Sequence, residues 1–365
     1  MESLGIYIHV PYCVRKCRYC DFCSHTPEND NEVATYFENI RLEMMQAAFA
    51  YRNKFYVNSI FFGGGTPSLV PAEELVRTLK CIQNNWLLAE DCEISLEANP
   101  GTIDMEKLQK YKAAGFNRIS LGVQSFNDDV LTALGRIHDS KTAISAFEML
   151  PFGNRNIDLM FGVPGQNMSI WEETLNTAIA LNPEHISFYS LQLEDGTPLF
   201  EDYKNGRIEL PSWEENRKMY HMAVKILKNA GYHHYEVSNA AKPGYECIHN
   251  LKYWKMQPYL GFGESAWSYL DGRRGIYNPN NTCVETEDEI DTKGDFIFTE
   301  LRLIDGFNTD DYFNLFGTHF ENDYKAVLNQ LISEGLLEQN GKIIRFTERG
   351  LDYTNPVMER LLNYE

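Results

Sequence analysis

The first two-thirds of this sequence alternates short apolar segments with amphipathic ones, and this alternation limits the available folds more than any other feature. The apolar segments predict strands at Leu4–Val10, Tyr56–Phe62, Cys92–Ala98, Asn117–Val123, Asn156–Gly162 and Glu184–Leu193. The amphipathic segments predict helices at Glu32–Tyr51, Pro71–Trp86, Asp104–Ala114, Asp128–Leu134, Lys141–Leu150 and Ile170–Leu181. Strands that alternate with helices indicate an α/β fold with a parallel sheet and helices outside it.

Both a partial barrel and an open doubly wound sheet would produce this alternation, and the polar residues favour the barrel. Glu97 ends the third strand, Gln124 follows the fourth, Asp158 lies in the fifth and Ser190 lies near the end of the sixth. Polar residues at one rim of every strand are typical of barrels, whereas an open sheet gathers them at one switch point. We therefore expect a partial (β/α)6 barrel of the TIM type.

The last third of the chain has a different pattern. The stretch 238–286 is rich in Gly, Pro, Asn and aromatic residues, and we expect an irregular connecting region there. Beyond it, helices precede a small hairpin at Leu337–Gln339 and Lys342–Phe346, which is typical of a winged-helix-like α+β domain. The expected division is a barrel at 1–237, the connecting region, and a C-terminal domain at 287–365.

Charge and hydropathy exclude several classes of function. The chain has 33 Lys and Arg against 52 Asp and Glu, a net charge of −19, which argues against nucleic acid as a partner. No apolar run reaches ~18 residues, so no membrane span is expected. The amino terminus lacks the pattern of a signal peptide, so we expect a cytoplasmic protein. Eight cysteines in that compartment indicate metal binding or catalysis before disulfides.

The cysteines at positions 13, 17 and 20 carry the strongest chemical signal. The spacing Cys13-x3-Cys17-x2-Cys20 lets one short loop wrap an iron–sulfur cluster, whose irons take soft thiolate ligands. Three ligands on a 4Fe–4S cubane leave one iron open for the amino and carboxylate groups of S-adenosylmethionine (SAM). A structural zinc site, which needs four ligands, is the alternative. Three nearby side chains could complete it: Cys23, His9 or His25.

The segment Tyr7-Ile-His-Val-Pro-Tyr-Cys, followed by the cysteine spacing and with Tyr19 before the last cysteine, resembles the radical SAM superfamily. More narrowly, the chain resembles the oxygen-independent coproporphyrinogen III oxidase-like branch. Matching segments follow in the same order: Gly63-Gly-Gly-Thr-Pro, Leu96-Glu-Ala-Asn-Pro, Gly122-Val-Gln-Ser-Phe-Asn, Asn156-Ile-Asp-Leu-Met-Phe-Gly and the C-terminal domain. The resemblance implies a 4Fe–4S cluster on Cys13, Cys17 and Cys20.

The resemblance also implies a SAM pocket, formed by Tyr7, Tyr19, Gly64, Gly65, Thr66, Glu97, Gln124, Arg136, Asp158 and Ser190. Its glycine loop would meet the methionine end of SAM, because glycine lets the backbone approach a ligand closely. The acidic and amide side chains would hold the ribose or the ammonium group. Arg136 would hold the carboxylate in a two-pronged contact, and Ser190 would lie near the adenine. Taken singly, each of these residues could instead be a rim ion pair, a helix cap or a core aromatic.

Two activities exist in this branch, decarboxylation of coproporphyrinogen III and haem delivery, and two features favour the haem chaperone group. Oxidases resemble C-x3-C-x2-C-x-C, whereas Phe22 stands at the last position here and Cys23 follows one residue later. The oxidases' long amino-terminal extension is also missing before residue 13. The second feature is His249-Asn-Leu-Lys-Tyr253-Trp254, which matches the H-N-x-x-Y-W motif of the haem-binding group.

For this group we expect haem and haem-accepting proteins as partners, and contact with membrane proteins at the membrane periphery is compatible with it. His249 is the expected axial ligand, because a neutral imidazole binds haem iron well. The fallback ligands are His233, His234 and Cys247. From the residues alone, the motif could also be a loop held by a hydrogen-bonded histidine and two buried aromatics. A third alternative, a nucleic-acid-modifying radical SAM enzyme, conflicts with the net charge of −19.

Overall fold

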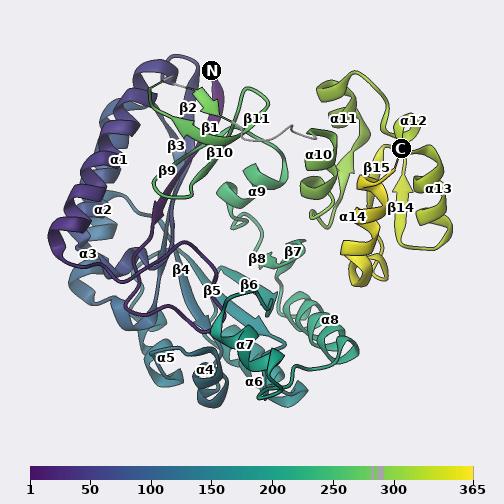
Figure 1. The fold of residues 1–365 in the computed structure, drawn as a ribbon, viewed down its shortest axis with the longest axis horizontal. Helices are drawn as coiled ribbons and strands as arrows, with labels where there is room; N and C mark the ends of the chain where they lie inside the picture. Colours follow the sequence, from purple (N-terminus) through teal and green to yellow (C-terminus); the bar gives the residue numbers. More distant parts are fainter. Residues whose placement is uncertain (281–282, 286–291, 365) are drawn as a thin grey trace.

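The computed structural model describes residues 1–280, 283–285 and 292–364 (Figure 1). Its first part alternates parallel strands with helices, as predicted. The strands are β1 (Glu2–Val10), β2 (Phe55–Gly64), β3 (Leu88–Ala98), β4 (Arg118–Gln124), β5 (Asn154–Phe161) and β6 (His185–Ser190). The helices are α1 (Asp30–Tyr51), α2 (Ala72–Asn85), α3 (Met105–Ala114), α4 (Asp128–Leu134), α5 (Ser140–Glu148), α6 (Met168–Ala180), α7 (Pro198–Lys204) and α8 (Trp213–Asn229).

The two faces of these strands have opposite character. Successive side chains point to opposite faces of a strand, so every second residue of β1 can be apolar and buried, as Ile6 and Ile8 are. This apolar face packs against the helices outside the sheet (Figure 1). The other face carries buried polar residues that bond to one another across strands. Asn156 donates to the Ser120 hydroxyl at 2.6 Å, and its Oδ1 lies 2.6 Å from Nδ1 of His185.

The sheet is a partial barrel, as predicted from the positions of the polar residues. Strands β1 to β6 lie side by side in chain order and are all parallel. In the described part of the chain the complete order is β12-β11-β10-β9-β1-β2-β3-β4-β5-β6-β8-β7, so the sheet is open at β12 and β7. This arrangement places the carboxyl ends of all six parallel strands at one rim.

The expectation of an irregular region at 238–286 is wrong, because this stretch extends the sheet at both ends. After β7 (His233–Glu236) it contains β8 (Asn239–Ala241), α9 (Ile248–Trp254), β9 (Tyr259–Phe262), β10 (Trp267–Leu270), β11 (Arg273–Asn278) and β12 (Cys283–Glu285). These strands are too short to show an alternating pattern, and the glycines between them mark tight turns, such as Gly272 with a φ of +71°. The expected boundary at 286–287 lies outside the described residues.

The C-terminal domain has its own core and a small antiparallel sheet in the order β13-β15-β14. Its elements are α10 (Thr292–Glu300), β13 (Phe307–Asn308), α11 (Thr309–Phe316), α12 (Phe320–Asp323), α13 (Lys325–Ser333), β14 (Leu337–Asn340), β15 (Ile343–Phe346) and α14 (Thr354–Leu362). Backbone hydrogen bonds join it to the barrel, from Val237 N–H to the Arg302 carbonyl (3.0 Å) and from Ile304 N–H to the Tyr235 carbonyl (3.1 Å). The domain is therefore attached at the edge strand β7.

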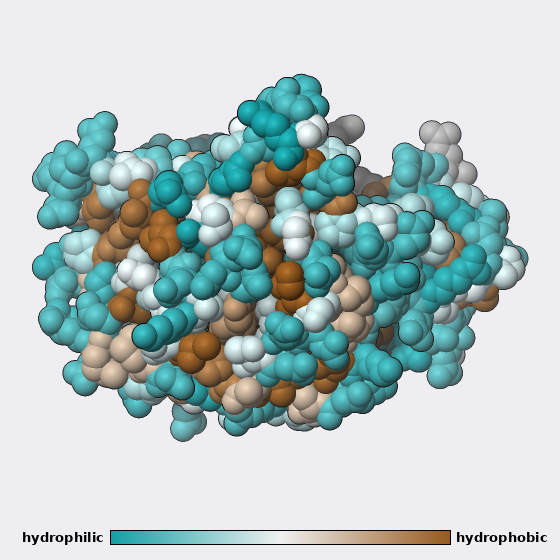
Figure 2. All heavy atoms as spheres, turned by 90° about the horizontal axis from the view of Figure 1, so that it is seen from below, coloured by the Kyte–Doolittle hydropathy of each residue, from teal (hydrophilic) through white to brown (hydrophobic). Residues whose placement is uncertain are grey.

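The face shown in Figure 2 is mainly hydrophilic, with apolar side chains scattered over it. Across residues 1–280, 283–285 and 292–364, no helix has the length and apolarity needed to cross a lipid bilayer.

Candidate functional site

The loop between β1 and α1 carries the predicted cysteines, and backbone hydrogen bonds fix its shape. His25 N–H donates to the Pro11 carbonyl at 2.8 Å, and Cys13 N–H donates to the His25 carbonyl at 2.9 Å, so the loop closes on itself. Arg18 anchors the middle of the loop, because its N–H donates to the Leu134 carbonyl at the end of α4. The cysteine loop is thus held at its base and at its centre.

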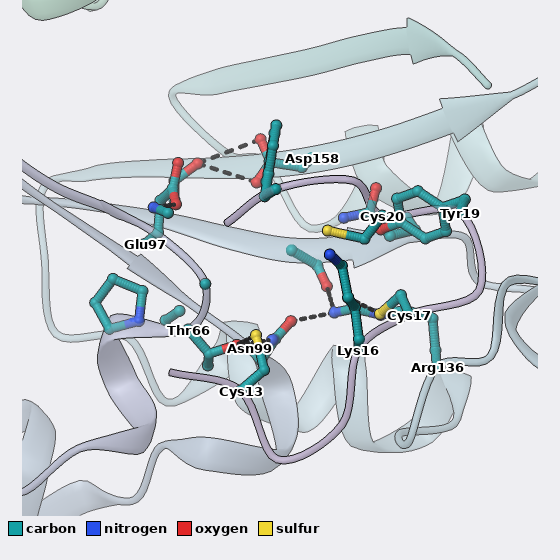
Figure 3. A pocket seen from close by; sticks show the side chains of 18 of the residues that line it. Cys13, Lys16, Cys17, Tyr19, Cys20, Thr66, Glu97, Asn99, Arg136 and Asp158 are labelled. Atoms are coloured by element: carbon teal, nitrogen blue, oxygen red, sulfur yellow. Dashed lines mark hydrogen bonds between the residues drawn. The ribbon is translucent and has the colours of Figure 1, made fainter. Parts of the chain in front are cut away.

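The thiols of Cys13, Cys17 and Cys20 surround one space, which we call the first cavity (Figure 3). It is lined by the cysteine loop, the glycine loop after β2 and the carboxyl ends of β3 to β6. Cys13 Sγ lies 3.5 Å from the Thr66 hydroxyl, and Arg136 Nη1 donates to Cys17 Sγ at 3.5 Å. Cys23 does not line this cavity. The structure therefore brings together the three cysteines that the spacing singles out, without the fourth.

The three thiols spread around the cavity. Among the described residues, no group of three or more His, Cys, Asp or Glu side chains is arranged to hold a single metal ion. A zinc ion needs its ligands within about 2.0–2.3 Å of one centre. A cubane cluster instead bonds each thiolate through a different iron. Three cysteines that line one cavity fit such a cluster.

The glycine loop lies against the cysteine loop. Gly65 N–H donates to the Val10 carbonyl and Thr66 N–H to the Tyr12 carbonyl, both at 2.8 Å. Gly64 has a φ of +112°, and a Cβ on it would lie 2.5 Å from the His9 ring. Glycine is therefore required here for the two loops to fit together, in addition to any contact with a ligand.

Glu97 and Asp158 place two carboxyl groups in the first cavity. Glu97 accepts a hydrogen bond from Gly64 N–H at 3.0 Å, and Asp158 accepts one from the Ser120 hydroxyl at 3.1 Å. Burial raises the pKa of Glu97 to about 8, and the charge of Asp158 adds to this rise. Burial also raises the pKa of Asp158. A cationic ligand would favour the ionised form of both groups, and SAM carries an ammonium and a sulfonium.

Gln124 reaches the first cavity through a break in the sheet. The pairing of β4 with β5 shifts between Gly122 and Gln124, and Gln124 has a φ of +69°. A non-glycine residue in this conformation costs about 1–3 kcal/mol and is most often kept at a functional site. Its side-chain oxygen accepts a hydrogen bond from the Tyr189 hydroxyl at 2.8 Å. The bulge therefore directs the amide toward the cavity.

Arg136 lies at the wall of the first cavity, beside the cysteine loop. Its Nη2 donates to the Gly122 carbonyl at 2.5 Å and also contacts the Asn99 side-chain oxygen, while Nη1 reaches Cys17. Its Nε is buried without a hydrogen-bond partner among the described residues. An unused buried donor at the wall of a cavity is suited to an anionic ligand group.

Most of the predicted pocket residues line the first cavity, but Tyr7 and Ser190 do not. The Ser190 hydroxyl accepts a hydrogen bond from Asn216 of α8 at 2.7 Å, so it points out of the barrel. Its neighbour Tyr189 lines the cavity instead. The alternation of β6 could have identified Tyr189. Asn99 was also missed, although it stands two residues after Glu97 and directly follows the same strand.

His249 does not lie where an axial haem ligand would be expected. It is fully buried in α9, with Nδ1 2.9 Å from the Ser59 hydroxyl and Nε2 2.8 Å from the Tyr253 hydroxyl. Its ring stacks on Phe61 at 5.3 Å. Burial lowers the pKa of His249 to about 3, so the ring is neutral. With both nitrogens engaged inside the barrel, His249 holds α9 against β2.

The two aromatic residues of the motif face a second cavity of about 550 Å³. Tyr253 and Trp254 form part of its wall, together with residues of β9, β10 and β11 on one side and of α10 on the other. Tyr7 and His9 of β1 also line it, with their side chains joined by a 3.0 Å hydrogen bond. Cys23 lines this cavity, and Phe22 lines both cavities. The two cavities are therefore neighbours at the same rim.

Comparison with known proteins gives the family. Residues 7–178 match the radical SAM superfamily, and residues 294–353 match the HemN C-terminal domain. The heme chaperone HemW of Bacillus subtilis is 33% identical over 98% of both chains, and that of Escherichia coli is 34% identical over 99% of both. Coproporphyrinogen III oxidase (HemN) from Escherichia coli has a similar fold, with a TM-score of 0.81, 22% identity and coverage of 100% of this chain and 91% of that one. The chain belongs to the heme chaperone HemW family of radical SAM proteins.

Proposed function

We propose that this protein is a haem carrier of the radical SAM type. In this proposal Cys13, Cys17 and Cys20 hold a 4Fe–4S cluster, SAM occupies the first cavity, and haem occupies the second cavity before transfer to an acceptor protein. SAM and the cluster supply one-electron chemistry in this superfamily. The protein's own residues bind and orient these groups.

The observation that carries the proposal is the second cavity beside the thiol-lined one. Its volume of about 550 Å³ lies within the ~300–1,000 Å³ typical of ligand sites. Its wall is rich in aromatic side chains, among them Tyr253, Trp254, Tyr259 and Trp267. Such rings offer large apolar area to a flat macrocycle and retain polar groups at their edges. The curated relatives named heme chaperone support the same ligand.

In the first cavity, the carboxyl groups of Glu97 and Asp158 would hold the cationic and hydroxyl groups of SAM. Arg136 would bind its carboxylate through the unused Nε–H. Tyr19 and the glycine loop would close the site around the ligand. We assign Tyr7 to the wall between the cavities, because it lines the second cavity while its pKa is raised by burial and by the charge of Glu97 in the first.

Replacing Arg136 by alanine should weaken SAM binding ten- to a hundredfold, since a charge-assisted contact is worth roughly 1.5–3 kcal/mol. Equilibrium binding of SAM to the cluster-loaded protein would measure this. Arg136→Lys keeps the charge but loses the planar guanidinium, so its SAM affinity should lie between those of the unmodified protein and Arg136→Ala. Unchanged SAM affinity in Arg136→Ala, with the cluster absorbance intact, would contradict the assignment.

Haem binding can be tested with two tryptophans of equal exposure. Trp267 lines the second cavity and Trp213 does not, and each is 52% exposed. We expect Trp267→Ala to weaken haem binding about tenfold, because an aromatic wall contributes about 1.5 kcal/mol beyond its buried area. Trp213→Ala should bind haem as the unmodified protein does. Soret titrations measure both.

The reconstituted protein can also be tested for the activity of the alternative function, coproporphyrinogen III oxidation. The reconstituted protein with SAM and a reductant should not convert coproporphyrinogen III to protoporphyrinogen IX. Formation of that product would place the protein among the oxidases. Failure of the unmodified protein to bind haem at micromolar concentration, with or without the cluster, would remove the proposed function.

A further inference from the structure

The second cavity contains one strongly basic side chain. Among the lining residues that the structure describes, Arg274 is the sole lysine or arginine. It lies on β11, and its side chain is 45% exposed. The centre of its guanidinium lies 5.6 Å from the ring centre of Trp267, which also lines the cavity. The stacked ring limits the orientations of the guanidinium at the cavity rim.

Asp295 of α10 faces this guanidinium from the C-terminal domain. Its Oδ1 lies 3.2 Å from Arg274 Nη1, and no second hydrogen bond joins these two side chains in the described structure. A carboxylate that fits a guanidinium well makes two parallel hydrogen bonds, usually at about 2.7–2.9 Å. The Arg274–Asp295 pair is therefore longer than a good two-pronged contact. The guanidinium retains donors for another carboxylate.

Apart from Arg274, the described wall of the cavity has no lysine or arginine that would favour an anionic ligand. Aromatic side chains such as Trp254, Tyr259 and Phe298 contact any flat apolar ring system, whatever its substituents. Haem differs from a simple apolar ring because it carries two propionate groups. A guanidinium at the rim would bind a carboxylate there while the macrocycle lies against the aromatic wall.

We propose that Arg274 binds a propionate carboxylate of the haem in the second cavity and makes the site selective for porphyrins with free carboxylates. This inference rests on the proposed function. The ligand carboxylate would share the guanidinium with Asp295, so the two carboxylates would repel each other. Arg274 would therefore raise the affinity for haem, and Asp295 would lower it.

The test compares haem with its dimethyl ester, which has the same macrocycle and iron but no carboxylate. We expect Arg274→Leu to lower haem affinity about tenfold, the lower end of the range for a charge-assisted contact because the side chain is partly exposed. Its affinity for the dimethyl ester should stay unchanged. Asp295→Asn should raise haem affinity severalfold and leave the ester unaffected. Soret titrations of both ligands with the two variants and the unmodified protein provide the affinities to be compared.

Arg273 supplies the matched control. It is the neighbouring residue on β11, is also exposed, and does not line the cavity. Arg273→Leu removes the same charge and should bind haem like the unmodified protein. Equal haem affinity in Arg274→Leu and the unmodified protein would overturn the inference and leave the proposed function standing. If Arg274→Leu weakened the binding of haem and of the dimethyl ester equally, the inference would also be overturned, because Arg274 would then act through its packing on Trp267. If the unmodified protein binds neither ligand, the proposed function itself fails.

Discussion

Simultaneous replacement of Cys13, Cys17 and Cys20 by alanine is expected to abolish the iron–sulfur cluster. The unmodified protein, purified without oxygen, should contain about four irons per chain, the content of one 4Fe–4S cluster. The triple variant should contain almost none, because the three thiols are the ones that line the first cavity. Iron analysis and visible absorbance measure the loss. Stoichiometric zinc in the unmodified protein would contradict this prediction.

Cys23→Ser is the matched control for the triple variant. Cys23 lies on the same loop but lines the second cavity. We expect this variant to keep the iron content and the absorbance of the cluster. Loss of the cluster in Cys23→Ser alone would show that a fourth thiolate is required, and the iron left open for SAM would then be in doubt.

His249→Ala is expected to lower the free energy of unfolding by about 2–5 kcal/mol. The change leaves the buried hydroxyl of Ser59 without its partner, which costs about 1–3 kcal/mol, removes a hydrogen bond from the partly buried Tyr253, and opens a cavity. Urea denaturation of the protein before cluster loading measures the effect. Haem affinity should change mainly through this loss of structure, since the imidazole does not face the second cavity.

His233→Ala is the comparison for this prediction. His233 has 46% of its side chain exposed, and its acidic neighbours Glu246 and Asp305 are 3.7 and 3.9 Å away. Its replacement should change the stability by no more than about 0.5 kcal/mol. If His249→Ala kept full stability but altered the Soret position of bound haem, His249 would be an axial ligand after all.

The sequence allowed the barrel and the first cavity to be predicted because their signals are local. Each parallel strand is one short, mainly apolar segment of the chain, and Cys13, Cys17 and Cys20 are close together in one loop. The resemblance placed Ser190 in the pocket, but its side chain is on the outer face of β6, and the neighbouring Tyr189 lines the cavity. The alternation of side chains along β6 shows that Tyr189, and not Ser190, faces the lumen. A position near the end of the strand does not distinguish the two residues.

The second cavity could not be predicted in the same way. Most of its wall comes from α9, the strands β9 to β11 and α10, which are far in sequence from β1 and the cysteine loop that complete it. These strands have 4–6 residues each and lie in a region rich in turn residues. The motif at 249–254 predicted an axial histidine because the sequence does not show which of its side chains face a cavity. Only its three-dimensional setting shows His249 inside the barrel and Trp254 at the cavity.

The opposite character of the two strand faces has an evolutionary consequence. Residues such as Ile6 and Ile157 hold the helices on the outer face, while Ser120 and Asp158 face the lumen from the same sheet. A substitution on the lumen face can alter what the barrel binds with little change in how the helices pack. Drift in ligand preference and drift in stability can therefore proceed separately, and relatives with one architecture can diverge in what they carry or transform.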